Sequence, residues 1–158
     1  MTLSWGAFLG ALGGAFLAPF AKAVVEGKFD GLRRVERHRD ELVDRICVVI
    51  RNVSDDSTLY WAQSAADLGP QDELIAARLG AALYNLNGLI CDLFSDDQQL
   101  LELTRDDYLD AADWVGCEFG NADRSAETSR LTAIYTSLYT LERQVRARRM
   151  QLKRSMVI

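Results

Sequence analysis

Residues that make turns, crosslinks or metal sites are scarce in this 158-residue chain, which contains two prolines, three cysteines and one histidine. So few prolines leave little room for a β architecture with many turns, and they favour helices. Cys47, Cys91 and Cys117 show no CxxC spacing, and His38 is the only histidine, so no zinc site is predicted. We expect the cysteines to be small buried hydrophobic residues in a reducing compartment.

Motifs for nucleotide binding or hydrolysis are also lacking. The sequence contains no GxGxxG, GxxxxGKS/T, GxSxG or HExxH pattern. Four carboxylates with spacings of 4, 4 and 3 share one helical face, namely Glu102, Asp106, Asp110 and Asp113. Metal sites in helical bundles usually add Glu-x-x-His motifs from several helices, which this chain lacks. We therefore interpret the four carboxylates as a solvated acidic face, and we expect no enzyme activity, metal or cofactor.

Positive and negative residues are segregated along the chain. Residues 1–51 hold 8 Lys/Arg and 6 Asp/Glu. Residues 52–123 hold 2 Lys/Arg and 15 Asp/Glu, and residues 124–158 hold 8 Lys/Arg and 2 Asp/Glu. The net charge is -5. This distribution argues against nonspecific nucleic-acid binding by the whole surface and leaves the C-terminal end as a basic patch.

The basic C-terminal patch carries more charge than a helix end requires. It consists of Arg143, Arg146, Arg148, Arg149, Lys153 and Arg154. Two or three of these cations would suffice to interact favourably with a helix C-terminus. The excess predicts a partner, for which anionic lipid or the acidic segment of a neighbouring subunit is favoured over nucleic acid.

The N-terminal region contains a long uncharged segment. Residues 2–21 have no charged side chain, and a helix of twenty residues is about 30 Å long, the thickness of the hydrocarbon core of a bilayer. Glycines cost a water-exposed helix about 1 kcal/mol each, whereas lipid enforces intrahelical hydrogen bonds and makes them tolerable. The segment therefore predicts a membrane-spanning helix.

Small residues recur every four positions in this segment. They form two adjacent columns of one helix face, and the residues expected to carry self-association are Gly6, Gly10, Gly14, Ala7, Ala11 and Ala18. Larger residues such as Leu9 and Leu12 fall on the opposite face. Because a face of small residues lets helices approach closely in lipid, the pattern favours homo-oligomeric packing over simple anchoring.

Basic residues follow the apolar segment, and none precedes it. Those within about twenty residues are Lys22, Lys28, Arg33, Arg34, Arg37 and Arg39. The positive-inside rule places the C-terminal side in the cytoplasm and the N-terminus outside the inner membrane. A cleaved signal peptide is disfavoured because no positive charge precedes the apolar run, and a helix buried in a soluble partner is the other alternative.

From residue 28 onward, apolar residues recur with a helical period. Ser54 to Ser57 offers N-caps for a short helix to Leu68, and Thr104 with Asp107 resembles a capping box. The predicted helices cover residues 28–54, a short stretch that ends at Leu68, and residues 71–94, 104–118 and 124–154. The residues expected to point inward are Leu32, Val35, Leu42, Ile46, Val49, Val53, Ile75, Leu79, Ala82, Leu86, Leu89, Leu93, Leu131, Ile134, Leu138, Leu141, Val145 and Leu152.

Some polar and aromatic residues within these helices invite a structural explanation. Arg148 occupies a position where the period of the last helix calls for an apolar residue. Asn85 and Asn87 flank Leu86, and we expect at least one of them to make a buried polar contact that fixes helix register. Three tyrosines are expected to wedge between helices, namely Tyr84, Tyr135 and Tyr139.

Together these patterns predict an all-α protein with a single N-terminal transmembrane helix, residues 1–27, and a cytoplasmic bundle of four to five helices, residues 28–158. The function most compatible with them is a non-enzymatic membrane effector whose spans self-associate and perturb the membrane. Toxin-like phage-defence effectors share this layout, an analogy of architecture and not of sequence. The alternative is a membrane-anchored scaffold subunit. The expected partners are the bilayer, further copies of the chain and another protein.

Overall fold

The protein is all-α throughout the part of the chain that can be described. The computed structural model describes the backbone of residues 5–155 and the side chains of residues 30–154. Within these residues there are helices and no strand, as the sequence predicts. The helices are α1 (Trp5–Trp61), α2 (Ala65–Leu68), α3 (Pro70–Leu93), α4 (Gln98–Gly116) and α5 (Thr128–Ser155). The chain forms two compact units, Met1–His38 and Arg39–Ile158.

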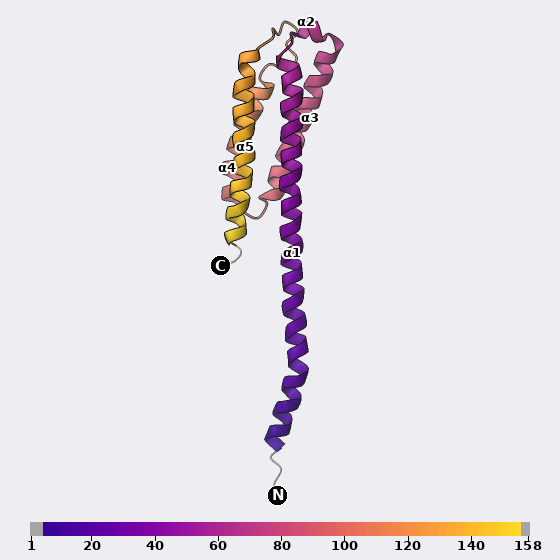
Figure 1. The fold of residues 1–158 in the computed structure, drawn as a ribbon, viewed down its shortest axis with the longest axis vertical. Helices are drawn as coiled ribbons and strands as arrows, with labels where there is room; N and C mark the ends of the chain where they lie inside the picture. Colours follow the sequence, from indigo (N-terminus) through magenta and orange to yellow (C-terminus); the bar gives the residue numbers. More distant parts are fainter. Residues whose placement is uncertain (1–4, 156–158) are drawn as a thin grey trace. The chain divides into compact units, whose positions relative to one another are not determined.

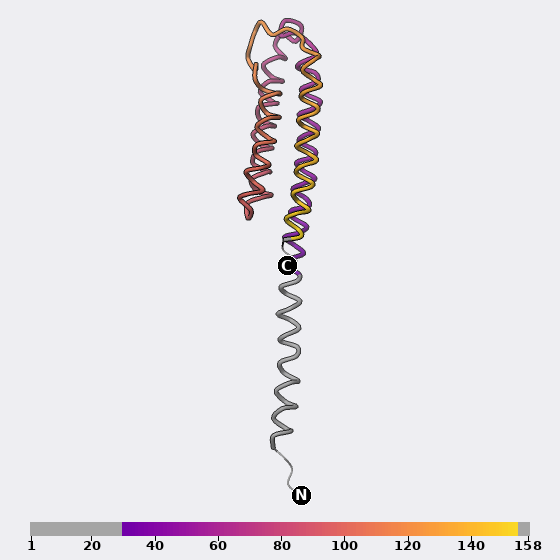
Figure 2. Tube along the Cα trace, turned by 90° about the vertical axis from the view of Figure 1, so that its left-hand side faces the viewer, coloured from indigo at the N-terminus to yellow at the C-terminus, as the bar shows by residue number. Residues whose placement is uncertain are grey.

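The second unit is a bundle of four helices. The part of α1 that begins at Arg39 lies beside α5 in one layer, and α3 and α4 form the other layer (Figures 1 and 2). Consecutive long helices run in opposite directions. One end of the bundle, the Arg39 end, holds the turn between α3 and α4 and the C-terminus of α5. The other end, the Trp61 end, holds α2 and the segment between α4 and α5.

The core of the bundle follows the helical period of the sequence. The buried residues predicted to point inward include Leu42, Ile46, Val53, Ile75, Leu79, Leu86, Leu89, Leu93, Ile134, Leu138, Leu141, Val145 and Leu152. Leu32 and Val35, also predicted to point inward, are exposed. They belong to the first unit, whose described residues contain only α1, so no second helix of that unit covers them.

The first helix of the bundle is longer than the sequence predicts. The expected break at Ser54 to Ser57 is wrong, because α1 continues to Trp61. The Thr58 hydroxyl donates to the Ser54 carbonyl at 2.8 Å, whereas the hydroxyl of the buried Ser57 has no hydrogen-bond partner among the described residues. Potential N-cap residues start a new helix only where the preceding helix stops.

The N-caps observed lie elsewhere. Ser64 and Asp67 form a capping box at the start of α2, and Pro70 occupies the first turn of α3. Helix α4 starts at Gln98 with Asp97 as its N-cap, so the predicted capping box at Thr104 is wrong. Thr104 is buried inside α4, and its hydroxyl donates to the Leu100 carbonyl at 2.7 Å. This bond inside the helix replaces the capping role.

Candidate interaction surfaces of the bundle

The small-residue face expected to carry self-association belongs to α1. Its residues are Gly6, Gly10, Gly14, Ala7, Ala11 and Ala18, whose side chains lie outside the described residues. Their backbone is helical within α1. The face therefore stays a prediction from the sequence.

Three of the six basic residues near the C-terminus have acidic partners within the bundle. Arg149 is buried and pairs with Asp40 of α1 at 3.0 Å. Arg148 pairs with Asp107 of α4 at 2.6 Å, which explains a cation at a position where the helical period calls for an apolar residue. Arg146 pairs with Glu142 one turn earlier at 2.8 Å, and this hydrogen bond raises the pKa of Arg146. These residues join α5 to its neighbours or to itself.

The other three basic residues form the exposed part of the patch. Arg143, Lys153 and Arg154 are exposed, and no ion pair within the described residues engages them. Lys153 and Arg154 lie in the last turn of α5, where cations interact favourably with the helix dipole. Arg149 is held against Asp40, so the last turn of α5 lies at the Arg39 end of the bundle. The charge available to a partner is thus half of what the sequence counts.

The four carboxylates that the sequence places on one face of α4 are solvated. Glu102, Asp106, Asp110 and Asp113 are all exposed, as the sequence interpretation expects. Among the described residues, no group of three or more His, Cys, Asp or Glu side chains is arranged to hold a metal ion. Helix α4 therefore presents an acidic outer face.

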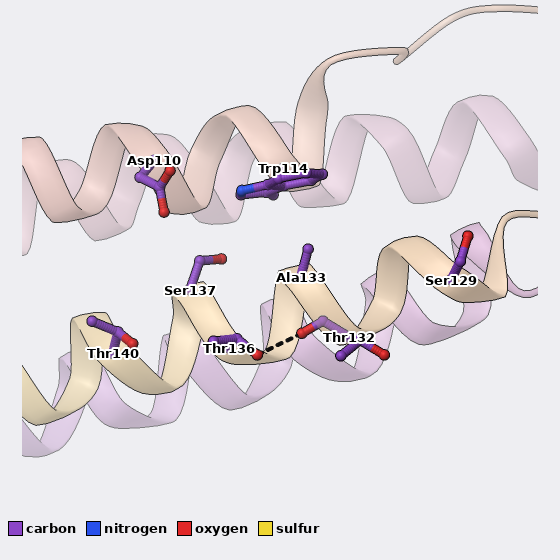
Figure 3. Close-up of a pocket in the computed structure, with 8 residues that line it drawn as sticks. All are labelled: Asp110, Trp114, Ser129, Thr132, Ala133, Thr136, Ser137 and Thr140. Atoms are coloured by element: carbon purple, nitrogen blue, oxygen red, sulfur yellow. Dashed lines mark hydrogen bonds between the residues drawn. The ribbon is translucent and has the colours of Figure 1, made fainter.

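A groove of about 460 Å³ runs between α4 and α5 at the half of the bundle nearer the Trp61 end. Figure 3 shows Trp114 of α4 above Ala133 of α5, with hydroxyl-bearing residues of α5 along the floor. The Thr136 hydroxyl donates to the Thr132 carbonyl at 2.7 Å, and the Ser137 hydroxyl to the Ile134 carbonyl at 3.0 Å. Both of these hydroxyls are therefore bonded to carbonyls of their own helix.

A buried arginine closes the Trp61 end. Arg124 donates to the carbonyls of Tyr60 at 2.6 Å and Gln63 at 2.7 Å, and it pairs with Asp72 of α3 at 2.5 Å. Its guanidinium lies 3.8 Å from the centre of the Tyr60 ring. The carbonyls at a helix C-terminus lack intrahelical donors, so Arg124 satisfies groups that burial would otherwise leave unpaired.

A second arginine packs on the neighbouring ring. Arg130 lies 3.9 Å from the centre of the Trp61 ring and donates through Nε to the Trp114 carbonyl at 2.9 Å. Burial lowers the pKa of Arg130. The Trp61 indole in turn donates to the Val115 carbonyl at 3.2 Å. The sequence analysis missed this arrangement, because Arg124 lies outside any helix and carries no periodic signal.

The cysteines differ in their surroundings. Cys47 is buried, and burial followed by the nearby Glu142 charge raises the pKa of its thiol to about 11. Cys91 is half-buried and Cys117 is exposed, so the expectation that all three are buried is wrong for Cys117. Cys117 follows the last residue of α4, where the chain leaves the core.

The predicted roles of the tyrosines and asparagines need correction. Tyr84 and Tyr139 are 82% and 67% exposed and do not wedge between helices, because they lie on outer faces. Tyr135, partly exposed, does bridge α5 to α1 through a 2.5 Å hydrogen bond to Thr58. Asn85 is exposed, and Asn87 is half-buried with a buried Oδ1 that has no hydrogen-bond partner in the described part of the chain.

One helix among the described residues, α3, is long and apolar enough to cross a membrane. Its Ile75, Leu79 and Leu86 lie in the core of the bundle, and its Arg78 pairs with Asp56 of α1 at 2.8 Å. Core helices of soluble bundles have the same length and composition, so α3 is weak support for a membrane span. The side chains of the apolar N-terminal segment lie outside the described residues.

Comparison with known proteins identifies no relative: no protein-family model, curated protein or solved structure matches this chain significantly.

Proposed function

We propose that this protein is a non-enzymatic membrane effector whose N-terminal helices self-associate in the inner membrane and perturb or permeabilise it. The observation that carries the proposal is the make-up of α1. This helix includes both the uncharged segment, from Trp5 to Ala21, and the first helix of the bundle. A helix of that apolar length suits the hydrocarbon core of a bilayer.

The residue pattern within the segment supports association over simple anchoring. In a helix, residues four positions apart share a face, so the helical backbone of α1 aligns Gly6, Gly10 and Gly14. Helices in lipid gain no hydrophobic energy by meeting each other, and close backbone packing at small residues is what holds them together. Copies of the chain are the simplest partners for such a face.

The charges that follow the segment support its orientation. Arg33, Arg34 and Arg37 of the first unit are exposed, and they follow the apolar run within about twenty residues. Cationic residues are retained on the cytoplasmic side, so the proposed topology has the N-terminus outside and the bundle in the cytoplasm. Lys153 and Arg154, exposed at the Arg39 end of the bundle, add charge suited to anionic lipid.

The proposal is tested by placing bulk on the small-residue face. Gly10→Leu with Gly14→Leu adds bulk where helices are proposed to approach and increases hydrophobicity, so insertion is retained while association falls. Leu9→Ala with Leu12→Ala changes the opposite face and is the matched control. The measurements are crosslinked oligomer size in membranes and dye entry into expressing cells. Wild-type assembly and dye entry for the double Leu variant, with failure of the control, would refute the assignment.

A scaffold function is the second candidate, and exposed apolar residues on α3 favour it. Leu74 and Tyr84 are 60% and 82% exposed, and a bound partner would cover them. A membrane-anchored scaffold would be harmless on expression and would copurify with a stable partner at fixed stoichiometry. Growth arrest with dye entry distinguishes the effector from the scaffold.

A further inference from the structure

Helix α5 has an exposed stripe that combines aromatic and basic residues. Tyr139, Arg143, Arg146 and Met150 are exposed and follow one another at spacings of 4, 3 and 4, so they lie along one face. We call this set the α5 stripe. Tyr139 is 67% exposed.

Helix α4 has an exposed stripe of opposite charge. Glu102, Asp106, Leu109 and Asp113 are exposed, with the same spacings of 4, 3 and 4. We call this set the α4 stripe. Leu109, which is 55% exposed, interrupts the carboxylates. Each stripe therefore combines charge of one sign with at least one large hydrophobic or aromatic side chain.

The two stripes lie at the same height along the bundle. Helices α4 and α5 run in opposite directions, and Figure 3 shows Trp114 of α4 opposite Ala133 of α5 and Asp110 opposite Ser137. Because both helices rise about 1.5 Å per residue, these pairs place Asp106 level with Arg143, and Leu109 level with Tyr139, to within about one helical turn of 5.4 Å. An acidic residue of the α4 stripe therefore lies at the same height as a basic residue of the α5 stripe, and Leu109 lies at the same height as Tyr139.

We propose that the α4 stripe of one copy of this chain docks on the α5 stripe of a second copy that points in the same direction. In this contact Asp106 of one copy meets Arg143 of the next, and Leu109 packs against Tyr139. The inference deepens the proposed function, since copies anchored in one membrane share a direction. Each copy uses two different surfaces, so the contact is head-to-tail and closes into a ring if the rotation permits.

Charge complementarity selects a second copy over a lipid surface. A lipid headgroup could satisfy Arg143, but it would repel the carboxylates of the α4 stripe and leave Leu109 exposed. Neither Asp106 nor Arg143 forms an ion pair within the described residues, so both are available to a neighbour. Potentials of opposite sign steer association and fix register between protein surfaces.

The contact is tested by cysteine crosslinking of the full chain in membranes. Two differently tagged copies are coexpressed in a Cys117→Ser background, one with Leu109→Cys and the other with Tyr139→Cys. We expect a crosslinked heterodimer. The matched control replaces Leu109→Cys with Tyr84→Cys, a highly exposed position on α3, and is expected to give no crosslink above background. No crosslink for the first pair, or equal crosslinking of the control, overturns the proposal.

Charge reversal identifies the ionic partner. Asp106→Arg on the Leu109→Cys copy should reduce crosslinking to the control level, and Arg143→Asp on the Tyr139→Cys copy should restore it. Loss without restoration indicates that Arg143 binds anionic lipid instead and overturns the pairing. The docking is measured by crosslinking, and the effector function is measured by dye entry. A crosslink between copies without dye entry therefore refutes the effector function and leaves the docking supported. Dye entry without the crosslink refutes only the docking.

Discussion

Arg124→Met removes the guanidinium that closes the Trp61 end of the bundle and keeps an unbranched apolar chain of similar length. The Arg124 side chain is fully buried, and the Asp72 side chain is 10% exposed. After the substitution Asp72 loses its ion-pair partner, and the carbonyls of Tyr60 and Gln63 lose their donor. The predicted effect is a large loss of stability.

The magnitude follows from these lost partners. Removing one member of a buried ion pair costs about 3–5 kcal/mol, because the remaining charge is left in a poorly solvated site. Asp72 lies in the first turn of α3, where the helix dipole stabilises a carboxylate and reduces the penalty. We therefore expect about 3 kcal/mol. With a urea dependence of about 2 kcal/mol per M, the unfolding midpoint falls by about 1.5 M.

The assay is urea unfolding of the detergent-solubilised full chain, followed by circular dichroism at 222 nm. Arg78→Met is the matched control, since Arg78 pairs with Asp56 at 2.8 Å while its own side chain is 58% exposed. Exposed pairs contribute about 1 kcal/mol or less. Asp72→Asn added to Arg124→Met should recover part of the loss. A difference below about 1 kcal/mol between Arg124→Met and Arg78→Met would show that the buried pair does not hold this end together.

Three further predictions concern reactivity, pairing and location. At pH 8 iodoacetamide should modify the exposed Cys117 quickly and the buried Cys47 only after unfolding, as measured by mass spectrometry. The pKa of Cys47 is raised from 9.0 to about 11 in the folded protein. The contribution of the protonated Cys47 thiol to stability is therefore complete below pH 9 and is lost as the pH rises toward 11. Arg148→Gln should lower the unfolding free energy by about 2 kcal/mol by leaving Asp107 unpaired, whereas Arg154→Gln should change it by less than about 0.5 kcal/mol. The full chain should sediment with membranes and resist carbonate extraction, and its recovery as a soluble monomer without detergent would contradict the membrane assignment.

The helices and core were predictable because one physical signal sets both. A helix packed on others must bury one face, so apolar residues recur every three or four positions. Leu79 and Leu138 could be placed inside by counting. The same count fails for Leu32, which is exposed, because periodicity shows which face is apolar and does not show whether a second helix covers it.

Helix ends were harder to predict than helix faces. Ser54 to Ser57 has the composition of a helix start, yet α1 continues through it because burial of Tyr60 and Trp61 stabilises the next turn. Packing of large side chains in the core is worth several kcal/mol, whereas an N-cap contributes about 1 kcal/mol. Tertiary packing therefore overrides the local signal.

The sequence predicted that a basic patch exists at the C-terminal end, but it did not predict which residues of the patch are exposed. The sequence identifies a basic C-terminal patch, but it cannot distinguish Arg149, which is buried against Asp40, from the exposed Arg154. That distinction depends on which residue of another helix lies opposite. Arg124 was missed for the same reason, because its partners Tyr60 and Asp72 are 64 and 52 positions away.

The charges that remain after internal pairing constrain how copies of this chain can meet. The charged residues of the α4 stripe are all acidic and those of the α5 stripe are all basic, so each stripe is of one sign. A two-fold dimer through either helix would bring like charges together, and such juxtaposition costs several kcal/mol at an interface. If its axis lay across the helices, such a dimer would also point the two copies in opposite directions, which is incompatible with the single membrane topology proposed above. A head-to-tail contact between α4 and α5 avoids both penalties, and it adds one copy after another without exhausting either surface until a ring closes.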